Sequence, residues 1–161
     1  MPPAYDRRMA TLAFRPATPG DVPSLMDLAS RMAAFELPPW RTAEEVVAAD
    51  GQAMTGAVMA ADPGSEVFIA ERDGVTAGCL HMMVAADFFG RHHAHISVIA
   101  TTADAEGSGV GRARMAFADD WARGRGLPLI TLNVFAGNAR ARRLYERAGF
   151  DVELLKYAKR V

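Results

Sequence analysis

The chain has 161 residues, of which 50% are hydrophobic and 23% are charged. This composition excludes a disordered protein and is typical of one domain with a substantial core. With 18 basic and 19 acidic side chains the net charge is −1, so no basic field exists to attract nucleic acid or an anionic membrane.

The single cysteine, Cys79, excludes an intrachain disulfide, and no cysteine and histidine cluster has the spacing of a structural zinc site. The N-terminus lacks the apolar core of a signal peptide, and no run approaches the roughly 20 apolar residues of a membrane helix. We therefore expect a cytoplasmic protein without a metal, with a loose tail at residues 1–10 and one domain at residues 11–161.

The first half of the domain contains signals for a strand, two helices and a hairpin. Thr18-Pro19-Gly20-Asp21 supplies turn residues before an apolar pattern of helical spacing, and Thr42 with Glu45 matches a capping box. A hairpin turn is predicted between two β-rich runs at residues 72–74. The expected elements are a strand at 11–15, helices from 22 to about 35 and from 42 to about 59, and strands at 67–70 and 76–84.

The second half alternates strands and helices, as expected of a single α/β domain with a mixed sheet. A helix beginning at Val110 is predicted to bury Ala113, Met115, Ala116 and Trp121 to varying degrees. The expected elements are a strand from 93 to 101, a helix from 110 to about 123, a strand at 129–134, a helix at 139–148, and one or two closing strands within 151–157.

Three alternating glycines, Gly107, Gly109 and Gly111, lie between a predicted strand and a predicted helix. Glycine leaves the backbone N–H groups of a helix N-terminus unobstructed, which suits a pyrophosphate. A nucleoside-triphosphate loop is excluded because Arg112 stands five residues after Gly107, where that motif needs glycine, and no lysine or hydroxyl residue directly follows it. A dinucleotide fingerprint is excluded because positions 112 and 114 are arginine rather than glycine.

A second motif at residues 138–150 reads Asn-x-x-Ala-x-x-Leu-Tyr-x-x-x-Gly-Phe. The order of strand, glycine turn, helix, strand and this motif resembles the GCN5-related N-acetyltransferases, which transfer an acetyl group from acetyl-CoA to an amine. The resemblance covers about residues 11–160. It departs at Glu106, where the family usually has arginine or glutamine. We expect this carboxylate to point outward and to weaken CoA binding.

The resemblance implies an α/β (α+β) fold with a mixed, mostly antiparallel sheet of six to seven strands flanked by about four helices. It implies acetyl-CoA as co-substrate, and it places main-chain pairing with pantetheine at the end of the strand before the glycine turn. The implied cofactor-binding residues are Ile99, Ala100, Thr101, Gly107, Ser108, Gly109, Val110, Gly111, Arg112 and Asn138.

Tyr145 and Asn138 each have two interpretations. Tyr145 lies on an apolar helical stripe and fits an ordinary core residue, whereas the resemblance implies that it protonates the departing CoA thiolate. A phenol suits that role because its ordinary pKa of about 10 keeps it protonated at neutral pH. Asn138 fits a helix N-cap, and the resemblance implies that it also orients the pantetheine arm.

The attacking amine must lose a proton, and His95 is the candidate base. It shares a strand face with His93 and Ser97 and lies eleven residues before Glu106, the spacing at which the histone-acetylating branch of the family carries a glutamate base. A histidine that packs or faces solvent is the equal alternative. His81, His92 and His93 are weaker candidates.

The acceptor is not identified by the sequence. Aromatic and proline-rich segments at residues 35–40 and 88–89 fit either the rim of an acceptor pocket or anchors for the core edge or a dimer surface. Glu36, Glu71 and Asp87 are equal candidates for holding a cationic amine. The sequence therefore predicts an N-acetyltransferase acting on a small-molecule or peptide amine, with a homodimer as one possible assembly. A non-catalytic acyl-CoA-binding regulatory domain, or an interaction protein whose turn binds no ligand, is the alternative.

Overall fold

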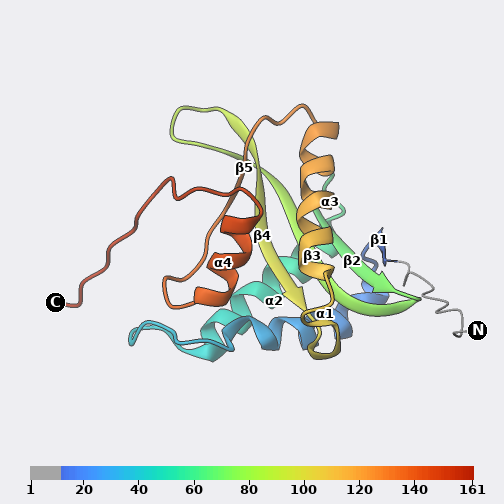
Figure 1. Cartoon of the computed structure of the whole chain (residues 1–161), viewed down its shortest axis with the longest axis horizontal. Coiled ribbons are helices and arrows are strands. Elements are labelled where there is room, and N and C mark those ends of the chain that lie inside the picture. Colours follow the sequence, from blue (N-terminus) through green and yellow to red (C-terminus); the bar gives the residue numbers. More distant parts are fainter. Residues whose placement is uncertain (1–11) are drawn as a thin grey trace, which may run out of the picture.

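The computed structural model describes residues 12–161, so the expected tail at residues 1–10 lies outside the described part. Five strands form one sheet whose spatial order follows the sequence (Figure 1). Neighbouring strands are antiparallel except β4 and β5, which are parallel. The mixed, mostly antiparallel sheet is thus confirmed, with five strands instead of six or seven. The strands are β1 (Leu12–Pro16), β2 (Ser65–Arg72), β3 (Val75–Ala86), β4 (His92–Thr101) and β5 (Ile130–Leu132).

Four α-helices flank the sheet, as expected: α1 (Val22–Ala29), α2 (Ala43–Ala60), α3 (Val110–Gly124) and α4 (Ala139–Arg147). A 3₁₀ turn at Ser30–Ala33 extends α1. The capping box before α2 is present, because the Thr42 hydroxyl accepts from the Glu45 N–H at 3.2 Å and the Glu45 carboxylate accepts from the Thr42 N–H at 2.9 Å. Within residues 12–161, no helix has both the length and the apolar character needed to cross a membrane.

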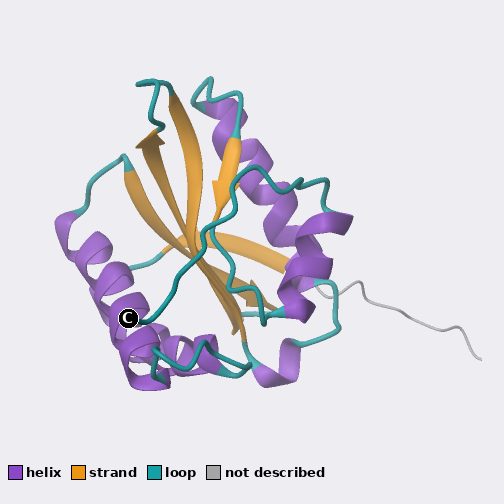
Figure 2. Cartoon of the chain, turned by 90° about the vertical axis from the view of Figure 1, so that its left-hand side faces the viewer, coloured by secondary structure: helices purple, strands orange, loops and turns teal. Residues whose placement is uncertain are grey.

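The sheet separates two layers of helices (Figure 2). On β2, Val67 and Ile69 pack with the cluster from α1 and α2, while Phe68 between them packs with the cluster from α3. This alternation follows from the period of two along a strand. Both faces of the central strands are therefore buried, which fixes the register that positions the end of β4.

The predicted hairpin between β2 and β3 is confirmed. Asp73 and Gly74 both have positive φ, at 51° and 78°, as a two-residue turn of the I′ type requires. The α3 helix also forms where expected, and Met115 and Trp121 are buried on it. The prediction for Ala116 was wrong, because Ala116 is exposed and Arg114 is buried instead.

The predicted closing strands at residues 151–157 are not present. After Gly149, at φ 90°, the chain leaves the sheet rather than returning along β5 (Figure 1). Arg160 donates to the Pro39 carbonyl at 3.1 Å, so the C-terminal segment runs toward the loop between α1 and α2. A strand at residues 151–157 would need a neighbouring strand to supply hydrogen bonds, and none of the described strands pairs with this segment.

Candidate functional site

The strands β4 and β5 separate partway along their length. They pair only from Ala94 to Ile96 on β4, so from Ser97 onward the outer edge of β4 has no strand beside it among the described residues. The pairing of β4 with β3 is also irregular here, because Val98 is opposite His81 and Ile96 is opposite Met82, which leaves Ser97 as an extra residue. Figure 1 shows β4 between α3 and α4 at this point. The separation leaves main-chain groups of β4 available to an extended ligand.

A cleft of about 1120 Å³ lies along this separation. Ten of the twelve predicted site residues line it; the exceptions are Ser108 and Val110. Val110 is 1% exposed and packs in the core, so its side chain anchors the start of α3. The N–H of Ser108 donates to the Ala105 carbonyl at 3.3 Å, so it is used within the turn.

The glycine turn has the conformation that its sequence requires. Gly107 and Gly109 have φ of 71° and 84°, and a Cβ on either would meet nothing within 4 Å, so both face open space. Gly111 is different, because it lies within α3 and a Cβ there would come within 3.4 Å of Leu144 on α4. Two glycines therefore shape the turn, and the third lets two helices approach. The first N–H groups of α3 point out of the helix toward this turn.

Glu106 is exposed, but its carboxylate is held by two arginines. Its carboxylate accepts from Arg31 Nη2 at 2.5 Å and from Arg140 Nη1 at 2.9 Å. These hydrogen bonds and charges, Arg140 first, hold the pKa of the carboxyl below its usual value. The acidic residue is thus neutralised by arginines from the α1 extension and from α4, and the three side chains lie together at the edge of the cleft.

A buried arginine fixes the end of β4. Arg114 is 2% exposed and donates to the carbonyls of Cys79 and Ala100 and to the hydroxyl of Thr101. Burial lowers the pKa of its guanidinium to about 10. Arg31 Nε donates to the Thr101 carbonyl at 2.8 Å. Because two arginines use these carbonyls, the free main-chain groups of this strand end are fewer than the sequence predicted.

Tyr145 and Asn138 each have a structural role and also line the cleft. Asn138 Oδ1 accepts from the Ala141 N–H at 3.1 Å, which confirms the N-cap, and Asn138 also lines the cleft. Tyr145 is 8% exposed and packs edge-on against Phe150, with ring centroids 6.0 Å apart. Its hydroxyl makes no hydrogen bond with residues 12–161, yet it is not enclosed in the core. Burial raises the pKa of the phenol, so it stays protonated at neutral pH.

Of the candidate histidines, only His95 is among the described residues that line the cleft. Its Nδ1 lies 2.8 Å from Thr131 Oγ1, and burial, followed by the charge of His93, lowers the pKa of its ring. His81 bonds Ser65 through Nε2 at 2.9 Å, and burial lowers its pKa to about 4. His93 is 8% exposed with an unpaired Nδ1. The hydrogen bond to Thr131 leaves Nε2 of His95 for chemistry in the cleft.

The predicted acceptor rim is only partly in place. Phe35 lines the cleft and contacts Phe135, with ring centroids 5.7 Å apart. Phe88 and Phe89 are exposed at the β3–β4 turn and do not line the cleft. None of the three predicted carboxylates lines the cleft. Glu71 pairs with Arg15 at 2.8 Å, and Asp87 caps its own turn through the N–H groups of Phe89 and Arg91. Glu36 makes no side-chain hydrogen bond or ion pair with residues 12–161.

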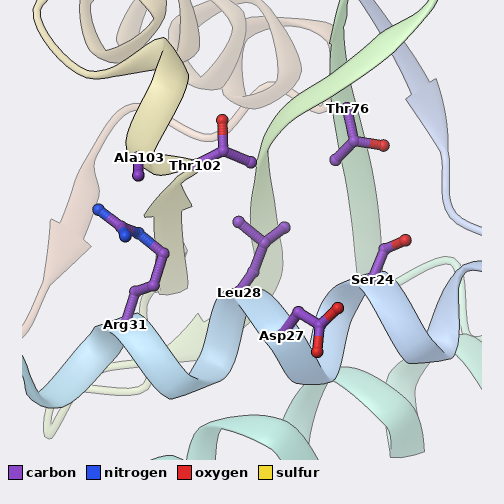
Figure 3. A pocket seen from close by; sticks show the side chains of 7 residues that line it. All are labelled: Ser24, Asp27, Leu28, Arg31, Thr76, Thr102 and Ala103. Atoms are coloured by element: carbon purple, nitrogen blue, oxygen red, sulfur yellow. The ribbon is translucent and has the colours of Figure 1, made fainter.

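A second hollow of about 200 Å³ lies between α1 and the ends of β3 and β4 (Figure 3). Arg31 and Thr102 line it from opposite sides, and Asp27 points away from the strands. Arg31 lines both this hollow and the cleft. The hollow is too small for a nucleotide cofactor, so the larger cleft is the candidate active site.

Sequence reasoning missed four charged residues of the cleft: Arg31, Arg41, Asp50 and Arg114. Arg114 had a detectable signal, because it follows Val110 by one helical turn on the apolar side of α3. Arg31 and Asp50 had none, since each lies on a surface-like stretch of its helix and faces the cleft only through tertiary packing.

Comparison with known proteins was consistent with this geometry. The sequence model described as the acetyltransferase (GNAT) family matches residues 25–150. No curated protein sequence matches the chain.

Solved structures share the fold. A provisionally named acetyltransferase from Agrobacterium tumefaciens is 24% identical, with a TM-score of 0.67, over 92% of this chain and 99% of that one. A transcriptional regulator from Bacillus halodurans is 22% identical, with a TM-score of 0.69, over 94% and 100%. AAC(6')-Iy in complex with the bisubstrate analogue CoA-S-monomethyl-acetylneamine is 16% identical, with a TM-score of 0.66, over 94% and 100%. At these identities the likeness concerns the fold.

Proposed function

Because the chain belongs to the acetyltransferase (GNAT) family, we propose that it transfers an acetyl group from acetyl-CoA to a primary amine by direct attack, without a covalent enzyme intermediate. The observation that carries the proposal is that the glycine turn, the free edge of β4, Tyr145 and His95 all border one cleft. A donor bound along this cleft would have its phosphates at the turn and its thioester beside the two titratable side chains.

The residues present fit acetyl-CoA. Gly107 and Gly109 leave the turn open to a pyrophosphate, and the N-terminus of α3 favours negative charge. Arg112, Arg143 and Arg147 also line the cleft, and none has a side-chain hydrogen bond or ion pair within residues 12–161. Free guanidinium groups suit phosphate oxygens. When bound, acetyl-CoA supplies the activated acyl group.

Two side chains would move the protons. His95 Nε2 takes a proton from the acceptor ammonium, and the neutral nitrogen then forms the N–C bond as the C–S bond breaks. The nitrogen loses its second proton to form the amide, and that proton restores the phenol that has protonated the sulfur. Tyr145 donates its phenolic proton toward the sulfur as negative charge develops there. Support for these roles comes from Nδ1 of His95, which is occupied by Thr131, and from the unpaired hydroxyl of Tyr145. The depressed pKa of His95 favours the neutral, basic ring at pH 7.

A non-catalytic acyl-CoA-binding regulator is the second candidate, and the regulator from Bacillus halodurans on the same fold favours considering it. Such a protein would keep the glycine turn but would have no need of a proton donor at Tyr145. The presence of the glycine turn and Tyr145 in one cleft favours catalysis.

The test is an amine panel assayed for release of free CoA, with polyamines, aminoglycosides, amino acids and N-terminal peptides as acceptors. Gly109→Val tests whether the turn binds acetyl-CoA. A β-branched residue is strained at the φ of 84°, and its side chain would extend into open space rather than into the core. We expect folded Gly109→Val to lose acetyl-CoA binding in calorimetry. Unchanged affinity would reject the turn as the phosphate site, and acetyl-CoA binding without turnover on any amine would favour the regulator.

We also keep a cytoplasmic location and a homodimer as parts of the proposal. Cell fractionation tests the first, and sedimentation of the purified chain tests the second.

A further inference from the structure

Three carboxylates line the cleft within the described residues: Glu45, Asp50 and Glu106. Glu45 accepts from the Thr42 N–H in the capping box, and Glu106 accepts from two arginines. Asp50 has no hydrogen bond or ion pair with residues 12–161. It is therefore the one acidic group of this cleft that is left for a ligand.

The position of Asp50 is fixed by the packing of α2. One turn further along this helix, Met54 is fully buried and its sulfur lies 3.6 Å from Cys79 Sγ on β3. The adjacent Gly51 is buried so closely against Met26 of α1 that a Cβ would come within 2.9 Å of it. With α2 held on both sides, Asp50 cannot withdraw from the cleft without breaking core contacts.

The environment of Asp50 is poor for an isolated negative charge. The side chain is half-buried, and burial raises the pKa of its carboxyl. Met54, one turn along α2, contacts Cys79 on β3, so this part of the helix lies against the sheet. A carboxylate in such a place is stabilised by a cation that hydrogen-bonds to it. Other side chains that line the same cleft are arginines, which suit an anion.

The cation bound by Asp50 cannot readily be the nitrogen that is acetylated. A neighbouring carboxylate raises the pKa of an amine and holds it as an ammonium ion, which has no lone pair for attack. The attacking nitrogen belongs beside His95, on β4. Asp50 and His95 line the same cleft, and α2 contacts β4, so one acceptor bound in the cleft can contact both residues.

We infer that Asp50 binds a second, non-reacting positive charge on the acceptor, so that the preferred substrates are diamines or other amines with an additional cationic group. The inference rests on the proposed acetyl transfer. Asp50 acts as a specificity-determining residue: it orients the acceptor so that its other amino group meets the thioester.

The test compares acceptors that differ only in the second charge, namely 1,4-diaminobutane and butylamine. For the wild-type protein we expect kcat/KM for the diamine to exceed that for the monoamine by about 10- to 100-fold, the range for one charge-assisted hydrogen bond. In Asp50→Asn this ratio should fall to near one, mainly because KM for the diamine rises. Asp27→Asn is the matched control, because Asp27 lies on α1 outside the cleft (Figure 3).

Binding measurements separate this inference from the proposed transfer. Calorimetry of 1,4-diaminobutane with the CoA-loaded protein reports the Asp50 site even if no amine is acetylated. Binding to the wild type that Asp50→Asn abolishes supports the site, with acetyl-CoA affinity unchanged as the sign that the variant is folded. An equal preference in the wild type and Asp50→Asn would overturn the inference. So would an equal loss of kcat for both amines, because that result would make Asp50 a base or a structural residue.

Discussion

Replacing Tyr145 with phenylalanine separates its packing from its chemistry. The ring stays in the core and keeps its edge-on contact with Phe150, worth about 0.5–1.5 kcal/mol for an aromatic pair. The hydroxyl makes no hydrogen bond with residues 12–161, so its removal leaves no protein group unpaired. We therefore expect the free energy of unfolding to change by less than about 1 kcal/mol.

The effect on catalysis should be much larger. Loss of a general acid lowers turnover by roughly 10²- to 10⁴-fold, which corresponds to about 3–5 kcal/mol of transition-state stabilisation. Because burial raises the pKa of the phenol, the wild-type donor remains protonated over the whole neutral range, and the loss should not depend on pH there.

The assay is release of CoA thiol under saturating amine, with acetyl-CoA affinity measured by calorimetry and stability by thermal unfolding. Tyr157→Phe is the matched control, because Tyr157 is 88% exposed in the C-terminal segment and should be indifferent to the same change. If Tyr145→Phe keeps kcat within a factor of a few, at unchanged stability, the residue serves the core and the acid is another group or water.

Three further predictions follow from the cleft and its supports. Gly78→Ala should destabilise the fold by about 1–3 kcal/mol and lower the Tm, because a Cβ would collide with the Ala100 carbonyl. The control Gly56→Ala, in open space on α2, should be neutral or stabilising. Equal Tm values for the two variants would contradict this prediction. Glu106→Gln should tighten acetyl-CoA binding by freeing Arg31 and Arg140 for phosphate, and weaker binding in calorimetry would mean that the carboxylate positions them. Activity should rise with pH through a midpoint below 6.5, because burial lowers the pKa of His95. This rise should be absent in His95→Gln. An identical pH profile in the variant would mean that another group or water deprotonates the amine.

Local sequence determined the parts of this protein that depend on near neighbours. The capping box at Thr42 and Glu45, the N-cap at Asn138 and the two left-handed glycines of the turn are each satisfied within a few residues of chain. Such features follow from backbone geometry and side-chain hydrogen bonds whatever the rest of the fold does. Strand and helix periodicity predicted the mixed sheet and its helices. The family resemblance added the twelve predicted site residues, ten of which line the cleft.

The acidic and basic groups of the cleft were decided only by tertiary structure. Glu106 forms an ion pair with Arg31, which is 75 positions away in the sequence. Asp50 lies at the cleft because Met54 packs α2 against Cys79 on β3. The C-terminal segment carried a strand pattern but lies along no strand of the described sheet. A sequence pattern shows which faces of a segment are apolar. Which strands pair, and which charged side chains meet across the fold, depend on how separate elements pack. For that reason the sequence indicated acetyl transfer, whereas the carboxylate available to the acceptor emerged only from the folded chain.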